Sequence, residues 1–169
     1  MDMLIKLYGE ALQIASAAAT GTATPTPTPI PTASVRKPIG PDHTAVLDWV
    51  AAHFSPGWAS EAQVALTNRP ITLWIATRNT NLLGFACFDA TARGFIGPIG
   101  VADAARGQGI GAALLRACLT DMRSFGYGYA VAGCVGAPEF FARVAGAIEI
   151  ADSSPGLYAG RLAPNPLQP

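Results

Sequence analysis

A glycine-rich turn lies between an apolar run and a long helical pattern, and this order constrains the fold more than any other feature of the sequence. The run is Phe95 to Val101, the turn is Arg106-Gly107-Gln108-Gly109-Ile110-Gly111, and the pattern extends from about Gly109 to Phe125. The spacing of the apolar residues predicts a strand, a turn and an amphipathic helix in that order. Glycines let a ligand approach the backbone closely, and the N-terminus of a helix carries partial positive charge. The turn therefore predicts a site for a phosphate group.

Two further apolar runs precede this strand. Thr72 to Thr77 and Leu82 to Ala90 are separated by a short polar turn, and a second short turn leads on to Phe95. Apolar runs joined by such turns are typical of hairpins. The sequence therefore predicts an antiparallel meander of three strands. Gly97 and Pro98 fit either a bulge or an ordinary edge irregularity in the last strand.

Helices are expected both before and after the meander in the sequence. One runs from Asp42 to Phe54, with Asp42 capping its start. A second begins at a capping box of Ser60 and Gln63 and stops before Pro70. After the long helix the pattern predicts a strand from Tyr127 to Val135, a helix from Pro138 to Val144, and weaker strands near Ile148 and Tyr158.

The length of the chain favours one domain. A chain of 169 residues that is 50% hydrophobic is long enough for one domain with a core and too short for two. We expect this domain at residues 35–169. Residues 18–34 contain an alternating Thr-Pro run that favours extended geometry, so a linker or a loop is expected there. Residues 1–17 are expected to form a short segment, in which Met3 to Tyr8 is a candidate strand.

Charge and composition argue against several classes of function. The formal net charge is zero, with 11 basic and 11 acidic side chains, and no run of Lys or Arg is suited to nucleic-acid phosphates. The three cysteines lack a CxxC spacing and the two histidines lack nearby ligand partners, so neither a disulfide framework nor a metal is expected. No run of residues has the length and hydrophobicity of a membrane span. We expect a cytoplasmic protein with no nucleic-acid or membrane partner.

The elements around the turn resemble those of a known family. A strand, then Arg106-x-x-Gly109-x-Gly111-Ala112, then an amphipathic helix is similar to the coenzyme A motif of the GNAT superfamily of N-acyltransferases. Residues 35–162 follow the order of elements of that superfamily, and Ala137 to Ala147 resembles its later motif, an aromatic pair on a helix followed by a glycine. The resemblance implies a three-layer α/β/α fold of the α+β class. It implies about four helices and a mixed, mostly antiparallel sheet of about six or seven strands, splayed open in a central V.

The resemblance also implies where acetyl-CoA binds. Backbone amides of the turn would hold the pyrophosphate, the preceding strand would pair with the pantetheine amides, and the thioester would lie where that strand splays from the next. Cys134 and Phe141 stand in the later motif, and Cys134 is expected to be a small buried thiol. The residues expected to bind the cofactor are Ile99, Gly100, Val101, Arg106, Gly107, Gln108, Gly109, Ile110, Gly111, Ala112, Cys134 and Phe141.

The same turn also fits a second class of ligand. Gly107, Gly109 and Ala112 match the G-x-G-x-x-A fingerprint of dinucleotide-binding proteins. That fingerprint needs a ribose-binding Asp or Glu about 20 residues further on, where this chain has Ala132-Gly133-Cys134-Val135. A dinucleotide-binding protein is therefore only the second alternative.

The acceptor side offers candidates for an acid and a base. In many members of the superfamily a tyrosine of the later motif lies near the leaving sulfur, but Phe141 stands at that position and has no proton to donate. Tyr158 or water is the expected substitute, since a thiolate leaves with little help near neutral pH. The candidate bases are Asp89 and Glu61. Asp89 also fits a cap of the turn to Arg93, and Glu61 also fits a favourable charge near the start of a helix.

These features together predict an enzyme. It would move an acetyl group from acetyl-CoA to an amine of a small molecule or peptide, by direct attack in a ternary complex. Phe141 and the lack of an evident base keep a non-catalytic acyl-CoA-binding module as the alternative. The expected partner is the amine acceptor, and a homodimer is left open.

Overall fold

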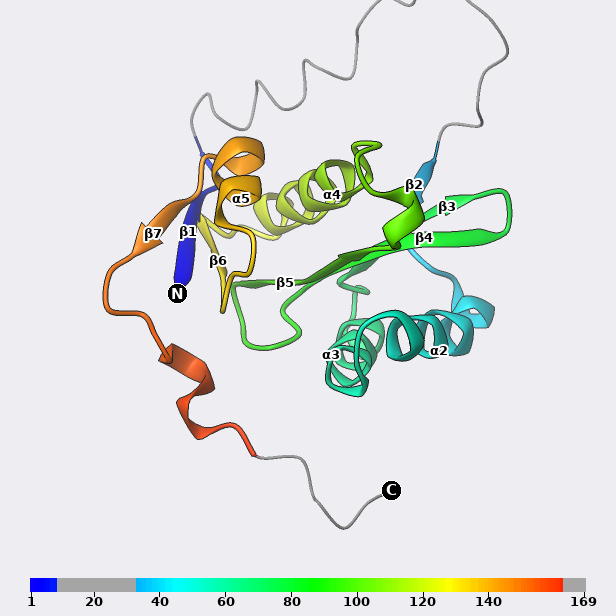
Figure 1. Cartoon of the computed structure of the whole chain (residues 1–169), viewed down its shortest axis with the longest axis horizontal. Helices are drawn as coiled ribbons and strands as arrows, with labels where there is room; N and C mark the ends of the chain where they lie inside the picture. The colour runs from blue at the N-terminus through cyan, green and yellow to red at the C-terminus, as the bar shows by residue number, and fades with distance from the viewer. Residues whose placement is uncertain (9–32, 163–169) are drawn as a thin grey trace, which may run out of the picture.

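A seven-stranded sheet forms the centre of the structure, a computed structural model that describes residues 1–8 and 33–162 (Figure 1). The strand order is β2-β3-β4-β5-β6-β1-β7. Neighbouring strands are antiparallel except β5 and β6, which are parallel. The strands are β1 (Asp2–Lys6), β2 (Ser34–Arg36), β3 (Leu73–Arg78), β4 (Asn81–Phe88), β5 (Phe95–Val101), β6 (Tyr129–Ala132) and β7 (Ile148–Ile150). The predicted mixed, mostly antiparallel sheet is confirmed, and with it the meander β3-β4-β5.

Helices cover both faces of the sheet, which gives three layers. In Figure 1, α2 (His43–His53) and α3 (Pro56–Thr67) lie below the sheet, and α4 (Ile110–Ser124) and α5 (Pro138–Ala145) lie above it. On β4, Phe85 and Cys87 are buried in the cluster with α2 and α3, whereas Ala86 is buried in the cluster with α4. A strand that is covered on both faces carries a continuous apolar run, as β4 does. The predicted α+β class is confirmed.

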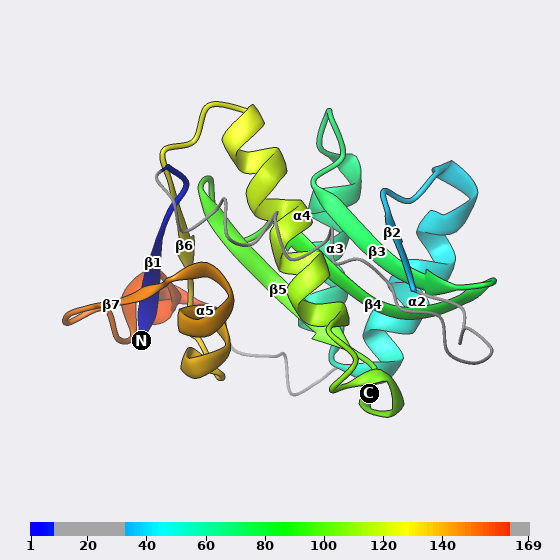
Figure 2. The same cartoon turned by 90° about the horizontal axis from the view of Figure 1, so that it is seen from above.

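β1 lies inside the sheet although it is the first element of the chain (Figure 2). It is antiparallel to both of its neighbours, so that Leu4 faces Val131 on β6 and Ile148 on β7. The strand expected near Tyr158 is absent: the structure has the 3-10 turn η3 (Gly156–Gly160) there, and that prediction is wrong. The position between β6 and β7 is filled by β1. The predicted linker at residues 18–34 falls largely within residues 9–32, which lie outside the described residues.

The start of α3 differs from its prediction. Ser55 is the N-cap, because its Oγ accepts a hydrogen bond from the Trp58 N–H at 3.1 Å, and Pro56 occupies the first turn. Ser60 lies inside the helix and donates its hydroxyl to the Pro56 carbonyl at 3.1 Å. The predicted capping box is therefore wrong. Proline and glycine after Ser55 resemble a break, but proline is favourable at the first position of a helix.

Asp42 also has a different role from the predicted one. It ends the 3-10 turn η1 (Gly40–Asp42), and its side chain makes no capping hydrogen bond to α2. Its Oδ2 accepts hydrogen bonds from the Ile39 N–H at 2.9 Å and from Arg36 Nη1 at 2.7 Å, and the bond from Arg36 is the main cause that lowers the pKa of the carboxyl. Asp42 therefore ties η1 to β2.

Two other findings bear on the class of protein. Within residues 1–8 and 33–162, none of the helices has the length and apolar character of a membrane span. The strands before α4 form an antiparallel meander and not a series of parallel βαβ units, which does not agree with a dinucleotide-binding Rossmann arrangement.

Candidate functional site

The glycine-rich turn connects β5 to α4 as predicted. The chain leaves β5, passes through the 3-10 turn η2 (Asp103–Ala105), and enters α4 at Gly109, its N-cap. Gly107 and Gly109 have φ of 76° and 78°, which side chains with a Cβ rarely adopt. A Cβ built at either glycine would meet no atom within 4 Å. These two glycines thus serve backbone conformation, and the space above them is open.

The first turn of α4 offers free N–H groups to this space. The first N–H to bond within the helix is that of Ala113, which donates to the Gly109 carbonyl at 3.0 Å. The N–H groups of Ile110, Gly111 and Ala112 precede it and have no acceptor within the helix. Such groups, with the helix dipole, favour an anion. The turn therefore offers a site for an anion such as a phosphate group.

The polar side chains of the turn are held by their neighbours. Arg106 Nη2 lies 2.9 Å from Asp103 Oδ1, and Arg106 Nε donates to the Val101 carbonyl at 3.4 Å. Gln108 Oε1 accepts from Arg78 Nη2 at 2.7 Å. Since the Arg106 side chain is 66% exposed, its charge faces solvent at the edge of the turn. Asp103 offsets part of that charge.

β5 separates from β6 just before the turn. The two strands pair only at Phe95 with Val131 and at Ile96 with Ala132 among the described residues. Gly97 follows with φ 123°, and the register of β5 against β4 shifts in the same region, so the strand is irregular at Gly97 and Pro98. Beyond it, β5 keeps β4 as its partner and its other edge is open, which forms the predicted splay.

The open edge of β5 carries backbone groups of two predicted cofactor residues. The Ala102 N–H donates to the Leu83 carbonyl at 2.9 Å, toward β4. Because backbone groups alternate in direction along a strand, those of Val101 and Ile99 face away from β4. Gly100 lies between them on the face of α2 and α3, where the Phe54 ring covers it. The open edge matches the position expected for pantetheine amides.

Tyr158 reaches the mouth of the splay. Its hydroxyl lies 3.1 Å from the position that a Cβ on Gly133 would take, and the Phe95 ring lies 2.9 Å from the same point. Gly133 directly follows Ala132, the last residue of β6 that pairs with β5. The η3 turn that carries Tyr158 therefore places a phenol where the two strands part.

Tyr158, Thr91 and Glu61 lie close together. Thr91 Oγ1 donates to Glu61 Oε1 at 2.5 Å, and both residues lie close enough to the Tyr158 hydroxyl to shift its pKa. Burial is the main cause that raises the pKa of the Tyr158 hydroxyl, the charges of Glu61 and Asp2 add to this, and the nearby Thr91 hydroxyl opposes it. Two of the three predicted catalytic candidates are thus brought together.

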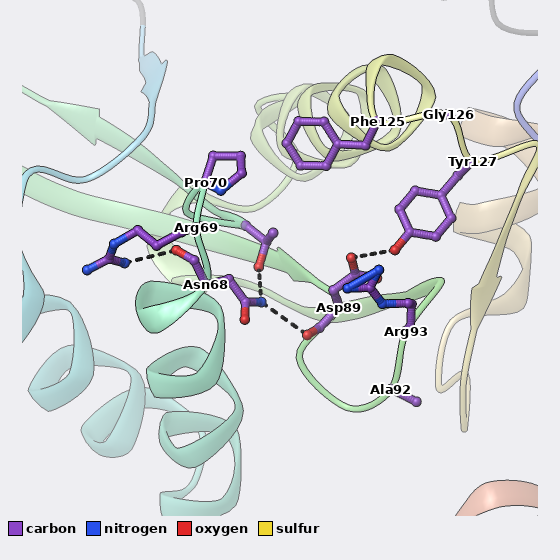
Figure 3. A pocket seen from close by; sticks show the side chains of 10 residues that line it. Asn68, Arg69, Pro70, Asp89, Ala92, Arg93, Phe125, Gly126 and Tyr127 are labelled. Atoms are coloured by element: carbon purple, nitrogen blue, oxygen red, sulfur yellow. Dashed lines mark hydrogen bonds between the residues drawn. The ribbon is translucent and has the colours of Figure 1, made fainter.

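Asp89, the third candidate, makes its hydrogen bonds to other residues, and Figure 3 shows it beside Tyr127 and Asn68. Its Oδ1 accepts from the Gly94 N–H at 2.7 Å and its Oδ2 accepts from the Tyr127 hydroxyl at 2.7 Å, while Asn68 Nδ2 donates to its carbonyl at 3.2 Å. This arrangement caps the turn after β4, which was the alternative expected for Asp89. The residue lines a cavity of about 590 Å³ between the end of α3 and the end of α4, at the opposite end of α4 from the glycine-rich turn.

The two residues of the later motif take different positions. Cys134 is exposed, with φ 48°, so the expectation of a buried thiol is wrong. The chain leaves β6 at Ala132 and turns, which places Cys134 outside the sheet. Phe141 lies on α5 as predicted, with its ring centroid 5.2 Å from that of Phe140, and it is partly buried against the core cluster that includes residues of α4. Neither side chain replaces the missing tyrosine.

Thr91 and Asp2 are members of this region that the sequence did not reveal. Thr91 stands in a polar turn and Asp2 at the second position of the chain, and no spacing connects either to Tyr158. Asp2 Oδ1 accepts from the Cys134 N–H at 2.9 Å, across 132 positions of the sequence. Within the part of the chain that the structure describes, no group of three or more His, Cys, Asp or Glu side chains is arranged to hold a metal.

Solved structures with this fold include two that cover most of the chain. One is a GCN5-related glucosamine N-acetyltransferase region of a fungal multi-domain β-N-acetylglucosaminidase, with TM-score 0.60, 14% identity, and coverage of 85% of this chain and 19% of that one. The other is a GCN5-related N-acetyltransferase from Sphaerobacter thermophilus, with TM-score 0.59, 21% identity, and coverage of 87% and 47%. At these identities the likeness shows the fold. The chain spans about a fifth and about half of the length of these two proteins.

A family model provides the evidence at the level of sequence. No curated protein matches the chain. The model described as the acetyltransferase (GNAT) family matches residues 43–146, which is more than half of the chain and includes α2 to α5. The point where β5 and β6 part and the glycine-rich turn at α4 lie within the matched region. The protein belongs to the acetyltransferase (GNAT) family.

Proposed function

We propose that this protein transfers the acetyl group of acetyl-CoA to an amine of a small molecule or peptide, by direct attack in a ternary complex. The observation that carries the proposal is the placement of the Tyr158 hydroxyl at the point where β5 and β6 part, beside Gly133. The open edge of β5 and the free N–H groups of α4 would align the donor so that its thioester reaches this point. The three free cysteines agree with a reducing, cytoplasmic location.

The acceptor would approach from the face of the sheet that carries α3. Glu61 would take the proton that the amine loses, while the amine nitrogen bonds to the carbonyl carbon of the thioester. The carbon–sulfur bond then breaks, and Tyr158 would give its proton to the departing thiolate. Its raised pKa keeps the phenol protonated through the neutral range. Thr91 is hydrogen-bonded to Glu61 and lies close to Tyr158, so it would return a proton from the carboxyl to the phenolate.

Binding of the donor is tested by calorimetry with acetyl-CoA. Arg106→Glu reverses the charge at the turn and is expected to weaken affinity by about tenfold or more, because phosphate oxygens repel a carboxylate. Arg123→Glu is the matched control, since it makes the same reversal at the other end of α4 and is also exposed. Equal affinities for the wild type and Arg106→Glu would show that the turn is not the phosphate site.

Turnover is tested by thiol release with a panel of small amines, amino acids, polyamines and peptides. Glu61→Gln and Tyr158→Phe are each expected to lower kcat by about tenfold or more, with little change in the affinity for acetyl-CoA. Asp89→Asn tests the remaining carboxylate. A loss of turnover with Asp89→Asn and none with Glu61→Gln would refute the choice of base.

The alternative is a non-catalytic acyl-CoA-binding module, which Phe141 favours because it stands where a tyrosine is usual. Both functions predict binding of acetyl-CoA at the turn. Binding without thiol release from any acceptor of the panel would support the module and contradict the proposed enzyme.

A further inference from the structure

Asp2 is a buried carboxylate at the start of β1, close to the proposed site. The residue is 7% exposed, although it is the second residue of the chain. β1 brings it between β6 and β7, at the end of β6 where the sheet splays. Burial of a charged side chain is costly unless it is hydrogen-bonded, so the contacts of Asp2 need an explanation.

Those contacts connect two segments that are separate in the sequence. Asp2 Oδ1 accepts from the Cys134 N–H at 2.9 Å, directly after Gly133. The Asp2 N–H donates to Ser153 Oγ at 2.7 Å, and that hydroxyl donates to the Ile150 carbonyl at 2.7 Å. One residue therefore bonds both to the turn after β6 and to the segment that follows β7.

Gly156 allows Asp2 to lie close to the segment that follows β7. It has φ 57° and begins η3, and a Cβ built on it would lie 3.1 Å from Asp2 Oδ2. Two residues later, Tyr158 extends its hydroxyl to Gly133. The carboxylate of Asp2 thus lies between the start of η3 and the turn that Tyr158 faces.

We propose that Asp2 is a positioning residue for acyl transfer, which ties the turn after β6 to η3 and so holds the Tyr158 hydroxyl at the mouth of the splay. This inference rests on the role proposed above for Tyr158. The charge of Asp2 also contributes to the raised pKa of Tyr158. The N-terminal strand is therefore part of the acceptor site as well as part of the sheet.

The test compares two substitutions in the full chain. Asp2→Ala removes the acceptor for the Cys134 N–H, and it is expected to lower kcat by about 10- to 100-fold, as misplacement of a catalytic group by about 1 Å does. Asp2→Asn keeps a carbonyl oxygen at Oδ1 and is expected to stay within about threefold of the wild type. Lys6→Ala, at the exposed far end of β1, is the control for changes in the strand itself.

A second background separates positioning from general stability. In Tyr158→Phe, adding Asp2→Ala is expected to cause no further loss of kcat, because the group that Asp2 positions is already absent. Gly156→Ala would push the Asp2 carboxylate away from η3 while Asp2 itself is intact. Adding Gly156→Ala to Tyr158→Phe is likewise expected to cause no further loss of kcat. If each double variant loses as much kcat as its two single variants together, the proposal is overturned.

A readout without turnover distinguishes failure of this inference from failure of the proposed function. Hydrogen–deuterium exchange at the Cys134 amide and at residues 153–160 is expected to accelerate in Asp2→Ala and not in Asp2→Asn. Unchanged exchange in Asp2→Ala would overturn the role of Asp2 alone. Unchanged turnover in Tyr158→Phe would refute the role of Tyr158, and with it that of Asp2, whatever the exchange shows.

Discussion

Gly100 on β5 allows a sharp test of how the acceptor face is packed. A Cβ on Gly100 would lie 2.4 Å from Phe54 Cζ and 2.6 Å from its Cε2. Carbon atoms in good contact are about 3.5 Å apart or more, so Gly100→Ala requires the Phe54 ring to move by about 1 Å. That ring stacks on Trp58 at 5.0 Å between centroids and packs against Phe85, which is fully buried. The ring therefore has little room to yield.

Two effects of opposite sign decide the stability of Gly100→Ala. In a strand, alanine is intrinsically better than glycine by about 0.5–1 kcal/mol. Overpacking of a well-packed cluster costs about 1–3 kcal/mol, so the clash dominates and we expect a net loss of about 1–2 kcal/mol. For a chain of this size, that loss lowers Tm by about 2–8 °C.

The assay is thermal unfolding of the variant beside a matched control. Gly128→Ala is the control, because a Cβ there meets no atom within 4 Å, and we expect its stability to be unchanged or raised by up to about 1 kcal/mol. In a Phe54→Leu background the penalty of Gly100→Ala is expected to shrink, since the ring that it meets is gone. A Tm of Gly100→Ala equal to or above that of the wild type would refute the packing of Phe54 on β5.

Three further predictions follow from single residues. In the folded protein, the exposed Cys134 is expected to react with an aromatic disulfide reagent, whereas the buried Cys87 and Cys118 react only on unfolding. Acetyl-CoA should slow the reaction of Cys134. Rapid reaction of all three thiols would contradict this prediction. Burial raises the pKa of the Cys87 and Cys118 thiols, so at a pH above the unfolded pKa of about 8.5 both thiols stay protonated in the folded state and ionise in the unfolded state. The free energy of unfolding should therefore fall by about 1.4 kcal/mol per pH unit for each thiol between pH 9 and 10. Denaturation of Cys118→Ala across that range should show about half the slope, and an unchanged slope would disprove the assignment. Gly109→Ala, at φ 78°, should cost about 1–2 kcal/mol in unfolding free energy and weaken the binding of acetyl-CoA measured by calorimetry, and unaltered binding would remove the turn from the site.

The donor side of the site could be predicted from the sequence because its features are local. Gly107 and Gly109 determine the shape of the turn through their own backbone angles, and the apolar stripe after Ile110 determines the helix. The meander was equally readable, since its strands are joined by short turns. Where two local signals competed the prediction failed, as at Ser55, where proline and glycine resembled a break but began α3.

The acceptor side depends on contacts between segments that are far apart in the sequence. Thr91 and Glu61 are 30 positions apart, and Asp2 and Cys134 are 132 apart. No periodicity or spacing encodes such pairs, because they form only when the sheet closes and burial selects one pairing of strands. The placement of β1 between β6 and β7 is of this kind: its apolar residues made it a candidate strand, but only the folded sheet had a position for it to fill. The sequence alone therefore determined the turn that fits the donor, and tertiary structure decided which side chains meet beside it.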